Sequence, residues 1–375
     1  MQRIENYSAD TTLFAVHRRF IDAVIAANAA AGATVAPSYV NGPAHGVNYG
    51  AGGAFYGGCL MRNGKALLSP SSNDNIFIFD HLTDTLTMGP AHGEQKAAFL
   101  GAISVSDTLV VLPPDASLYI GLYNPVTNTY TRGPAKPESG LKYAGGCVMP
   151  NGKVFIAPLT ATHVAIYDPV TNTVTTGAEM TGRGGAQLMP NGMVFCPPSA
   201  DTGGFMLLYD PATDSVIPVN ISYPETRDAV PIADGRLACV PTDMARVFLF
   251  DFRNRNDLAN PIVTGTASWP NNVTNKFWGG ALAANGDVVF APYGRPKVGY
   301  YRPPSLGQPL GQVFDGPDMP VDGIVERFTG CIPLLDGRFL MVPRKFAYVG
   351  LYTHLTGAQP LPPSVLMSPF YSNSF

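Results

Sequence analysis

A basic residue recurs just upstream of a tight turn in six of seven repeated segments of this chain. Each lies eight to eleven residues before the second residue of the turn. The six are Lys96, Lys142, Arg183, Arg227, Lys276 and Arg327. Aromatic residues are interspersed among them: Phe55, Tyr56, Phe99, Tyr143, Phe277, Trp278 and Phe328. If the segments share one register in a closed ring, these cations gather around one opening.

Such a ring would focus a positive potential, which could hold an acidic sugar, a phosphate or the carboxylates of a protein partner. A second interpretation is equally concrete. The cations are loop charges that pair with nearby acids such as Glu94, Asp228 and Glu326. The sequence leaves both interpretations open.

No arrangement of residues predicts catalysis or metal binding. The six histidines share no ligand spacing, and no H-E-x-x-H or G-x-S-x-G motif is present. Asp168 and Asp210 each precede a proline in a tight turn, where an aspartate usually bonds its own backbone two residues on. We therefore predict no catalytic residue, no metal and no cofactor.

The elements that position these cations repeat seven times. The second residues of the seven turns are Gly64, Asp107, Gly152, Gly192, Gly235, Gly286 and Gly337. A proline stands six residues after each: Pro70, Pro113, Pro158, Pro198, Pro241, Pro292 and Pro343. Asn-Gly and Asp-Gly favour two-residue hairpins, because both central residues need positive φ. Proline ends the following strand, because it has no N–H to donate.

Each repeat divides into four strands. A glycine-containing strand precedes the turn, and a continuous apolar run such as 154–157 follows it, which indicates burial on both faces. A third strand ends in an aromatic residue, and a Thr-rich fourth strand is expected to face solvent. Sheets that are covered on both sides must be sandwiched between copies of themselves. The sequence therefore predicts an all-β fold, a seven-bladed β-propeller of four-stranded antiparallel blades.

We place the propeller at residues 51–375 and expect each blade to supply its own four strands. The blades are predicted at about 51–93, 94–139, 140–180, 181–225, 226–272, 273–322 and 323–375.

Residues 1–50 form a predicted N-terminal arm, with an amphipathic helix at about 11–31 and a Gly/Pro/Asn-rich linker after it. The apolar residues at helical spacing are Leu13, Phe14, Val16, Phe20, Ile21, Val24 and Ile25. This helix either covers a face of the propeller or docks onto a neighbouring protein.

Composition excludes several classes of protein. Hydrophobic residues make up 46% of the chain, which rules out disorder, and the formal net charge of −3 predicts neither nucleic acid nor an anionic membrane as the main partner. The N-terminus has no signal-peptide pattern, no stretch is long and apolar enough to insert in a membrane, and five scattered cysteines are expected to be free, buried residues.

The turn, the apolar strand and the following Y-D-P-x-T stretch resemble kelch repeats and the propeller proteins of tailed bacteriophages. The kelch Gly-Gly pair and tryptophan are missing from their usual places. The resemblance implies a non-enzymatic structural or interaction protein of a virion tail, tail tip, fibre or neck, made in the host cytoplasm. Its expected partners are other virion proteins, further copies of itself and a host surface glycan or receptor. The alternatives are a carbohydrate-binding, receptor-recognising module and a kelch-like enzyme.

Overall fold

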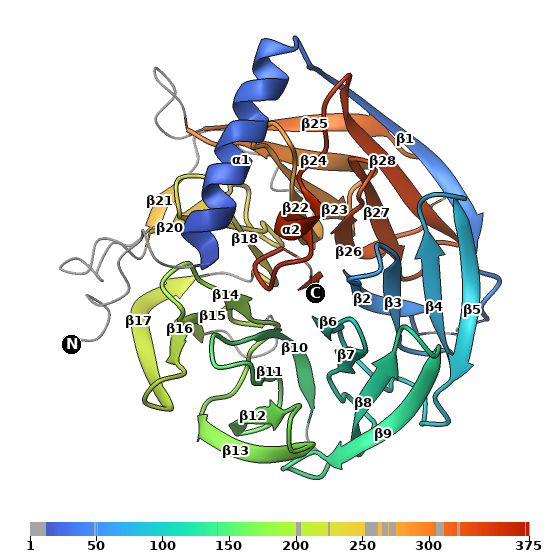
Figure 1. The fold of residues 1–375 in the computed structure, drawn as a ribbon, viewed down its shortest axis with the longest axis vertical. Helices are drawn as coiled ribbons and strands as arrows, with labels where there is room; N and C mark the ends of the chain where they lie inside the picture. Colours follow the sequence, from blue (N-terminus) through green and yellow to red (C-terminus); the bar gives the residue numbers. More distant parts are fainter. Residues whose placement is uncertain are drawn as a thin grey trace.

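The computed structural model describes residues 13–374 except for 49, 51, 141, 200–203, 224–225, 252–261, 265–268, 270–274, 305–310, 321–322 and 372. Seven sheets are arranged as a ring of blades around a centre (Figure 1). The predicted seven-bladed propeller of four-stranded antiparallel blades is confirmed.

Blade 1 contains β2 (Phe55–Leu60), β3 (Ala66–Pro70), β4 (Asn75–Asp80) and β5 (Thr85–Ala91). Blade 2 contains β6 (Ile103–Ser106), β7 (Leu109–Leu112), β8 (Tyr119–Asn124) and β9 (Thr129–Ala135). Blade 3 contains β10 (Tyr143–Val148), β11 (Val154–Pro158), β12 (His163–Asp168) and β13 (Thr173–Glu179). Blade 4 contains β14 (Gln187–Leu188), β15 (Val194–Cys196), β16 (Gly204–Asp210) and β17 (Ser215–Tyr223). Blade 5 contains β18 (Ala229–Pro231), β19 (Leu237–Cys239), β20 (Phe248–Phe250) and β21 (Ile262–Thr264). Blade 6 contains β22 (Phe277–Leu282), β23 (Val288–Pro292), β24 (Lys297–Arg302) and β25 (Gln312–Asp318). Blade 7 contains β26 (Phe328–Pro333), β27 (Arg338–Pro343) and β28 (Tyr348–Thr356).

Burial along each blade follows the sequence pattern. The second strands β3, β11 and β23 are buried at every position, because neighbouring blades cover both of their faces. The fourth strands β5, β9 and β13 contain only exposed and half-buried residues. All five cysteines are buried and free, as the sequence predicts.

The N-terminal segment corrects one prediction. β1 (Thr34–Ala44) is the outermost strand of blade 7, and the order of that sheet is β1-β28-β27-β26. It runs antiparallel to β28, with Thr34 opposite Thr356 and Ala44 opposite Tyr348. The linker predicted at 33–50 is therefore largely a strand. The expectation that blade 7 supplies all four of its own strands is wrong.

The sequence contains a signal for this closure. The stretch N-G-P-A-H-G at 41–46 repeats the M-G-P-A-H-G at 88–93, where β5 ends. The two histidines also have equivalent contacts. His45 and His92 each bond a backbone oxygen through Nε2 at 2.8 Å. Each ring also packs edge-on against a phenylalanine, Phe55 or Phe99, with 5.5 Å between centroids. The N-terminal segment is thus a displaced fourth strand.

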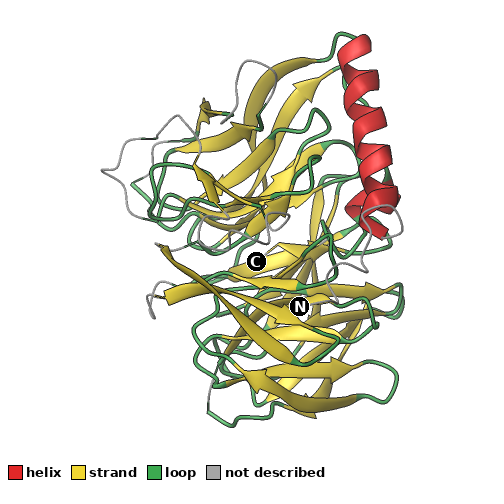
Figure 2. Cartoon of the chain, turned by 90° about the vertical axis from the view of Figure 1, so that its left-hand side faces the viewer, coloured by secondary structure: helices red, strands yellow, loops and turns green. Residues whose placement is uncertain are grey.

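One face of the ring is covered by the chain itself. The helix α1 (Leu13–Ala30) lies along one side of the molecule (Figure 2). Asn28 Nδ2 donates to the carbonyls of Ala284 and Gln359 at 3.2 and 3.0 Å, and Ile25 packs against the turn at Gly286. Because these contacts involve the turn that joins the first two strands of blade 6, we call this side the turn face.

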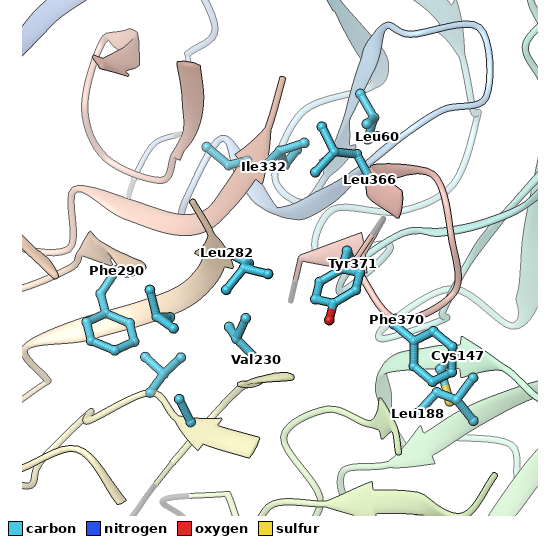
Figure 3. Packing of buried hydrophobic residues seen from close by; sticks show 14 of the residues in the cluster. Leu60, Cys147, Leu188, Val230, Leu282, Phe290, Ile332, Leu366, Phe370 and Tyr371 are labelled. Atoms are coloured by element: carbon cyan, nitrogen blue, oxygen red, sulfur yellow. The ribbon is translucent and has the colours of Figure 1, made fainter. Parts of the chain in front are cut away.

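The C-terminal segment closes the centre of the ring from the same side. It includes the short helix α2 (Pro363–Leu366) and ends in β29 (Asn373–Ser374), which pairs with the innermost strand β2. Phe370 and Tyr371 lie between the inner strands, close to Leu188, Val230 and Leu282 (Figure 3). Both are only 6% exposed. Within the described residues, no helix is long and apolar enough to cross a membrane.

Candidate binding site at the open mouth

The face opposite α1 is where the inner strands begin. Each blade is an antiparallel meander, so the first strand runs from this side to the turn face. We call the opening here the mouth. It is formed by the first residues of the inner strands and by the residues after the strand-stopping prolines.

Five side chains at the mouth form one group, which we call the mouth cluster: Tyr56, Arg227, Trp278, Tyr293 and Arg344. The Trp278 ring lies 5.4 Å from Tyr56 and 4.4 Å from Tyr293, measured between centroids. The guanidinium of Arg227 lies 4.0 Å from the centroid of the Trp278 ring. That of Arg344 lies 4.9 Å from Tyr56 and 5.7 Å from Tyr293. These residues come from blades 1, 5, 6 and 7, so only ring closure brings them together.

The electrostatics of the mouth centre on the Tyr56 hydroxyl. Burial raises the pKa of Tyr56, while the charges of Arg227 and Arg344 and a hydrogen bond from Arg344 oppose that rise. Arg344 Nε also lies 3.0 Å from Glu326 Oε2. Trp278, Tyr293 and Arg227 are nearly buried, whereas Tyr56 is partly buried and the Arg344 side chain is 20% exposed. Tyr56 and Arg344 are therefore the least buried residues of the cluster.

The six predicted cations do not share one position. Phe55, Tyr143, Phe277 and Phe328 each pair with the strand-stopping proline of their blade. Arg183 takes that place in blade 4, opposite Pro198. Lys142, Lys276 and Arg327 come one residue earlier, and Lys96 comes three residues before its aromatic Phe99. Arg227 lies eight residues before the second residue of its turn, whereas Arg183 lies nine residues before it. The cations are therefore not a ring of equivalent residues.

Most of these cations are used within the protein. Arg183 Nε donates to the carbonyl of Thr181 at 2.8 Å, and Arg327 Nη1 to that of Pro320 at 3.0 Å. Lys276 is fully buried with Nζ 3.2 Å from the Asp243 carbonyl, and burial lowers its pKa. Only Arg227 joins the aromatic cluster.

Lys142 and Lys96 lie at the surface. Lys142 Nζ lies 2.9 Å from Asp115 Oδ1, and its side chain is 46% exposed. Burial raises the pKa of Asp115, against the hydrogen bond and charge of Lys142. Asp115 also contributes to the field at Tyr56, which places the Lys142–Asp115 pair beside the mouth cluster. Lys96 is exposed and lines a groove of about 440 Å³ between the loop at 44–48 and blade 1.

Sequence reasoning missed Arg344 and Tyr293. Both directly follow a strand-stopping proline, Pro343 and Pro292, so they hold the same register position in neighbouring blades. Leu159, after Pro158, packs in the same apolar group as Trp278 and Tyr293. The position directly after each strand-stopping proline could thus have been used to predict residues of the mouth from the sequence.

The residues predicted for a docking helix are divided between two environments. Phe14 and Ile21 are buried against the chain's own propeller, and Val24 and Ile25 are half-buried against the same core. Val16 and Phe20 are each 48% exposed. Leu13 begins α1, and its side chain lies outside the described residues, as does the predicted start of the helix at residue 11. The helix covers a face of the propeller, and docking of its outer side stays a prediction.

Among the described residues, no group of three or more His, Cys, Asp or Glu side chains could hold a metal ion. The side chains that meet at the mouth are those of arginine, tyrosine and tryptophan.

The fold defines a seven-bladed propeller protein, and comparison with known proteins extends this. No family model matches the chain, and no curated protein does. Among solved structures, it is similar to virginiamycin B lyase from Staphylococcus aureus, with a TM-score of 0.67 and 14% identity over 85% of this chain and 99% of that one. A catalytically inactive form of that lyase, with quinupristin, has a TM-score of 0.66 and 13% identity over 85% of this chain and 99% of that one. YCF48 bound to a D1 peptide has a TM-score of 0.59 and 14% identity over 85% of this chain and 94% of that one.

These similarities correct the prediction that the chain is not an enzyme. The lyase is an enzyme, and its whole chain superposes on this propeller. An identity of 14% shows a shared fold and not a shared reaction. The similar propellers have varied functions, so neither the kelch-like repeats nor the virion setting is supported by them.

Proposed function

We propose that the mouth cluster binds a small anionic group: a carboxylate, a phosphate or an acidic sugar. The observation that carries this proposal is the pairing of two guanidinium groups with three aromatic rings at the uncovered end of the ring. Guanidinium groups bind planar anions through two parallel hydrogen bonds, and aromatic rings restrict their motion. The other end is closed by α1 and the C-terminal segment, which leaves the mouth as the accessible end.

Ligand binding is compatible with this type of propeller. Two of the similar structures hold a ligand, quinupristin in one and a D1 peptide in the other. Tyr56 would contribute a hydroxyl next to the bound anion, with Arg344 hydrogen-bonded to it. An activity assay measures turnover of a ligand at this site separately from its binding.

Replacement of Arg344 by Gln or Arg227 by Ala should weaken anion binding by about tenfold each, because each removes a charge-assisted hydrogen bond. The chain has two tryptophans, so a Trp269→Phe background leaves Trp278 as a fluorescent reporter inside the cluster. Titration with phosphate, acetate and N-acetylneuraminate gives the affinities, and calorimetry checks them without the reporter.

Arg132→Ala is the matched control. Arg132 is an exposed arginine paired with Glu94 on blade 2, so its loss changes the net charge equally without touching the mouth cluster. If Arg132→Ala weakens binding as much as Arg344→Gln, or if none of the three anions binds the unaltered protein, the mouth is not an anion site.

A second proposal concerns the turn face and retains the virion setting. Three apolar residues occupy the same position in successive turns between third and fourth strands: Leu82, Val126 and Val170, which are 81%, 70% and 92% exposed. The exposed Val16 and Phe20 lie on the helix that covers the same face. Exposed apolar groups on one face favour attachment to another protein. We propose that this face attaches the propeller to a phage tail or neck, with a host receptor or glycan reached from the mouth.

Val126→Asp combined with Val170→Asp should reduce incorporation into particles severalfold, because it places charge in the proposed contact. Quantitative mass spectrometry of purified particles measures the copy number. Val325→Asp is the control, because Val325 is also exposed, at 63%, but lies on the mouth side between β25 and β26. Particles that lack the protein altogether, or equal incorporation of both variants, would contradict the proposal.

A further inference from the structure

Blade 5 carries a carboxylate at an inner-strand position where four other blades carry glycine. The residues paired with the fourth position after the turn are Gly58, Ile103, Gly146, Ala229, Gly280 and Cys331. The preceding residue is glycine in four of these six blades (Gly57, Gly145, Gly279 and Gly330) and Ala102 in blade 2. In blade 5 it is Asp228. The crowded inner strands therefore accept a side chain at this level in blade 5.

Asp228 bridges two inner strands. Its Oδ2 accepts a hydrogen bond from the backbone N–H of Gly280 in blade 6 at 3.1 Å, and its Oδ1 accepts one from Ala229 at 2.8 Å. The residue is half-buried, on the inner strand of blade 5 next to that of blade 6. Neither hydrogen bond comes from a charged group, and each carboxylate oxygen can accept a further donor.

The surroundings of Asp228 place it directly below the mouth cluster. Arg227, the preceding residue, stacks on Trp278, which lies two residues before Gly280 on the adjoining strand. The titratable groups that interact with Asp228 are the thiols of Cys239 and Cys331, whose pKa values its charge raises further. Burial raises the pKa of Asp228 to about 7, against the two backbone hydrogen bonds.

We propose that Asp228 and the arginines of the mouth cluster form a two-point site for a ligand that carries an anionic group beside a hydrogen-bond donor, such as an ammonium or hydroxyl group. This inference rests on the proposed anion site, which Asp228 extends toward the inner strands of blades 5 and 6. Arg227 and Arg344 hold the anion, and the carboxylate of Asp228 accepts the donor. The ligand class is that of amino acids, hydroxy acids and hydroxylated acidic sugars.

The test compares L-alanine with propionate, which share a carboxylate and differ by an ammonium group. Above its pKa Asp228 is ionised and attracts the ammonium, whereas below it the neutral carboxyl does not. The preference for L-alanine should therefore rise about tenfold between pH 6 and pH 8, since a hydrogen bond to a charged group contributes at least that much. The readout is Trp278 fluorescence in the Trp269→Phe background.

Asp228→Asn should keep propionate binding and show no change of preference with pH. Asp318→Asn, an exposed carboxylate on β25, is the control that should behave like the unaltered protein. A preference that does not change with pH, while propionate binding still depends on Arg344, overturns this inference and leaves the anion site standing. Absence of binding by both probes overturns the two together. If Asp228→Asn does not fold, the pH dependence of the unaltered protein decides.

Discussion

Removal of residues 1–44 should abolish the cooperative unfolding of this propeller. β1 supplies the outer strand of blade 7, and its loss leaves the backbone donors and acceptors of β28 unpaired along a new sheet edge. It also uncovers Leu351 and Tyr352, which are 4% and 0% exposed in the closed ring. A domain of this kind has a total stability of about 5–15 kcal/mol, so the loss of a whole strand should consume most of it.

Removal of residues 1–32 provides the comparison, because it deletes α1 and keeps β1. That variant should remain a folded propeller with a lower melting temperature, since it exposes the apolar groups that Phe14 and Ile21 cover. Urea denaturation followed by circular dichroism, together with gel filtration, distinguishes the two. Equal midpoints for the two truncations would show that β1 does not hold the ring closed.

Asp287→Ala should destabilise the protein by about 3–5 kcal/mol, the cost expected when one partner of a buried ion pair is removed. Asp287 is 1% exposed and receives hydrogen bonds from Arg302 Nε and Nη2 at 3.0 Å each and from His354 Nε2 at 2.9 Å. His354 lies on β28 and Arg302 on β24, so this group ties blade 6 to the blade that closes the ring. The substitution leaves the buried His354 and the partly exposed Arg302 without this acceptor.

The pH dependence of this contribution follows from the pKa of Asp287. Burial acts to raise it, but the hydrogen bonds and charges of His354 and Arg302 outweigh burial and hold it below the ordinary value of 3.8. The stabilisation is thus fully present at neutral pH and is lost as the pH falls below that value. Thermal unfolding at pH 7 and pH 3 should show the gap between Asp287→Ala and the unaltered protein narrowing in acid.

Asp318→Ala is the control for the size of the effect. Asp318 is 73% exposed and pairs with Lys297 at 3.4 Å on the same blade. An exposed pair of this kind contributes about 0.2–1 kcal/mol. If Asp287→Ala costs no more than Asp318→Ala, the buried group does not couple the two blades.

The repeated turn, apolar strand and proline were sufficient to predict seven blades, because each feature is a local consequence of backbone chemistry. Asn-Gly turns, doubly buried strands and stopping prolines have the same meaning wherever they occur in a chain. The strand β1 escaped prediction because it pairs with β28, more than three hundred residues away. Its matching G-P-A-H-G stretch was visible, but the pattern alone does not say which sheet receives it.

The mouth depended on tertiary structure for a different reason. The sequence supplied a regular spacing of cations, and spacing along a chain does not give the direction of a side chain. Arg183 and Arg327 bond backbone oxygens of their own loops, whereas the packing of blade 5 against blade 6 brings Lys276 to the Asp243 carbonyl and Arg227 against Trp278. Closure of the ring brought Arg344 from the last blade to Tyr56 in the first. The sequence by itself thus determined the number of blades and the order of strands and turns within each, whereas only the closed ring decided which charges meet at its mouth.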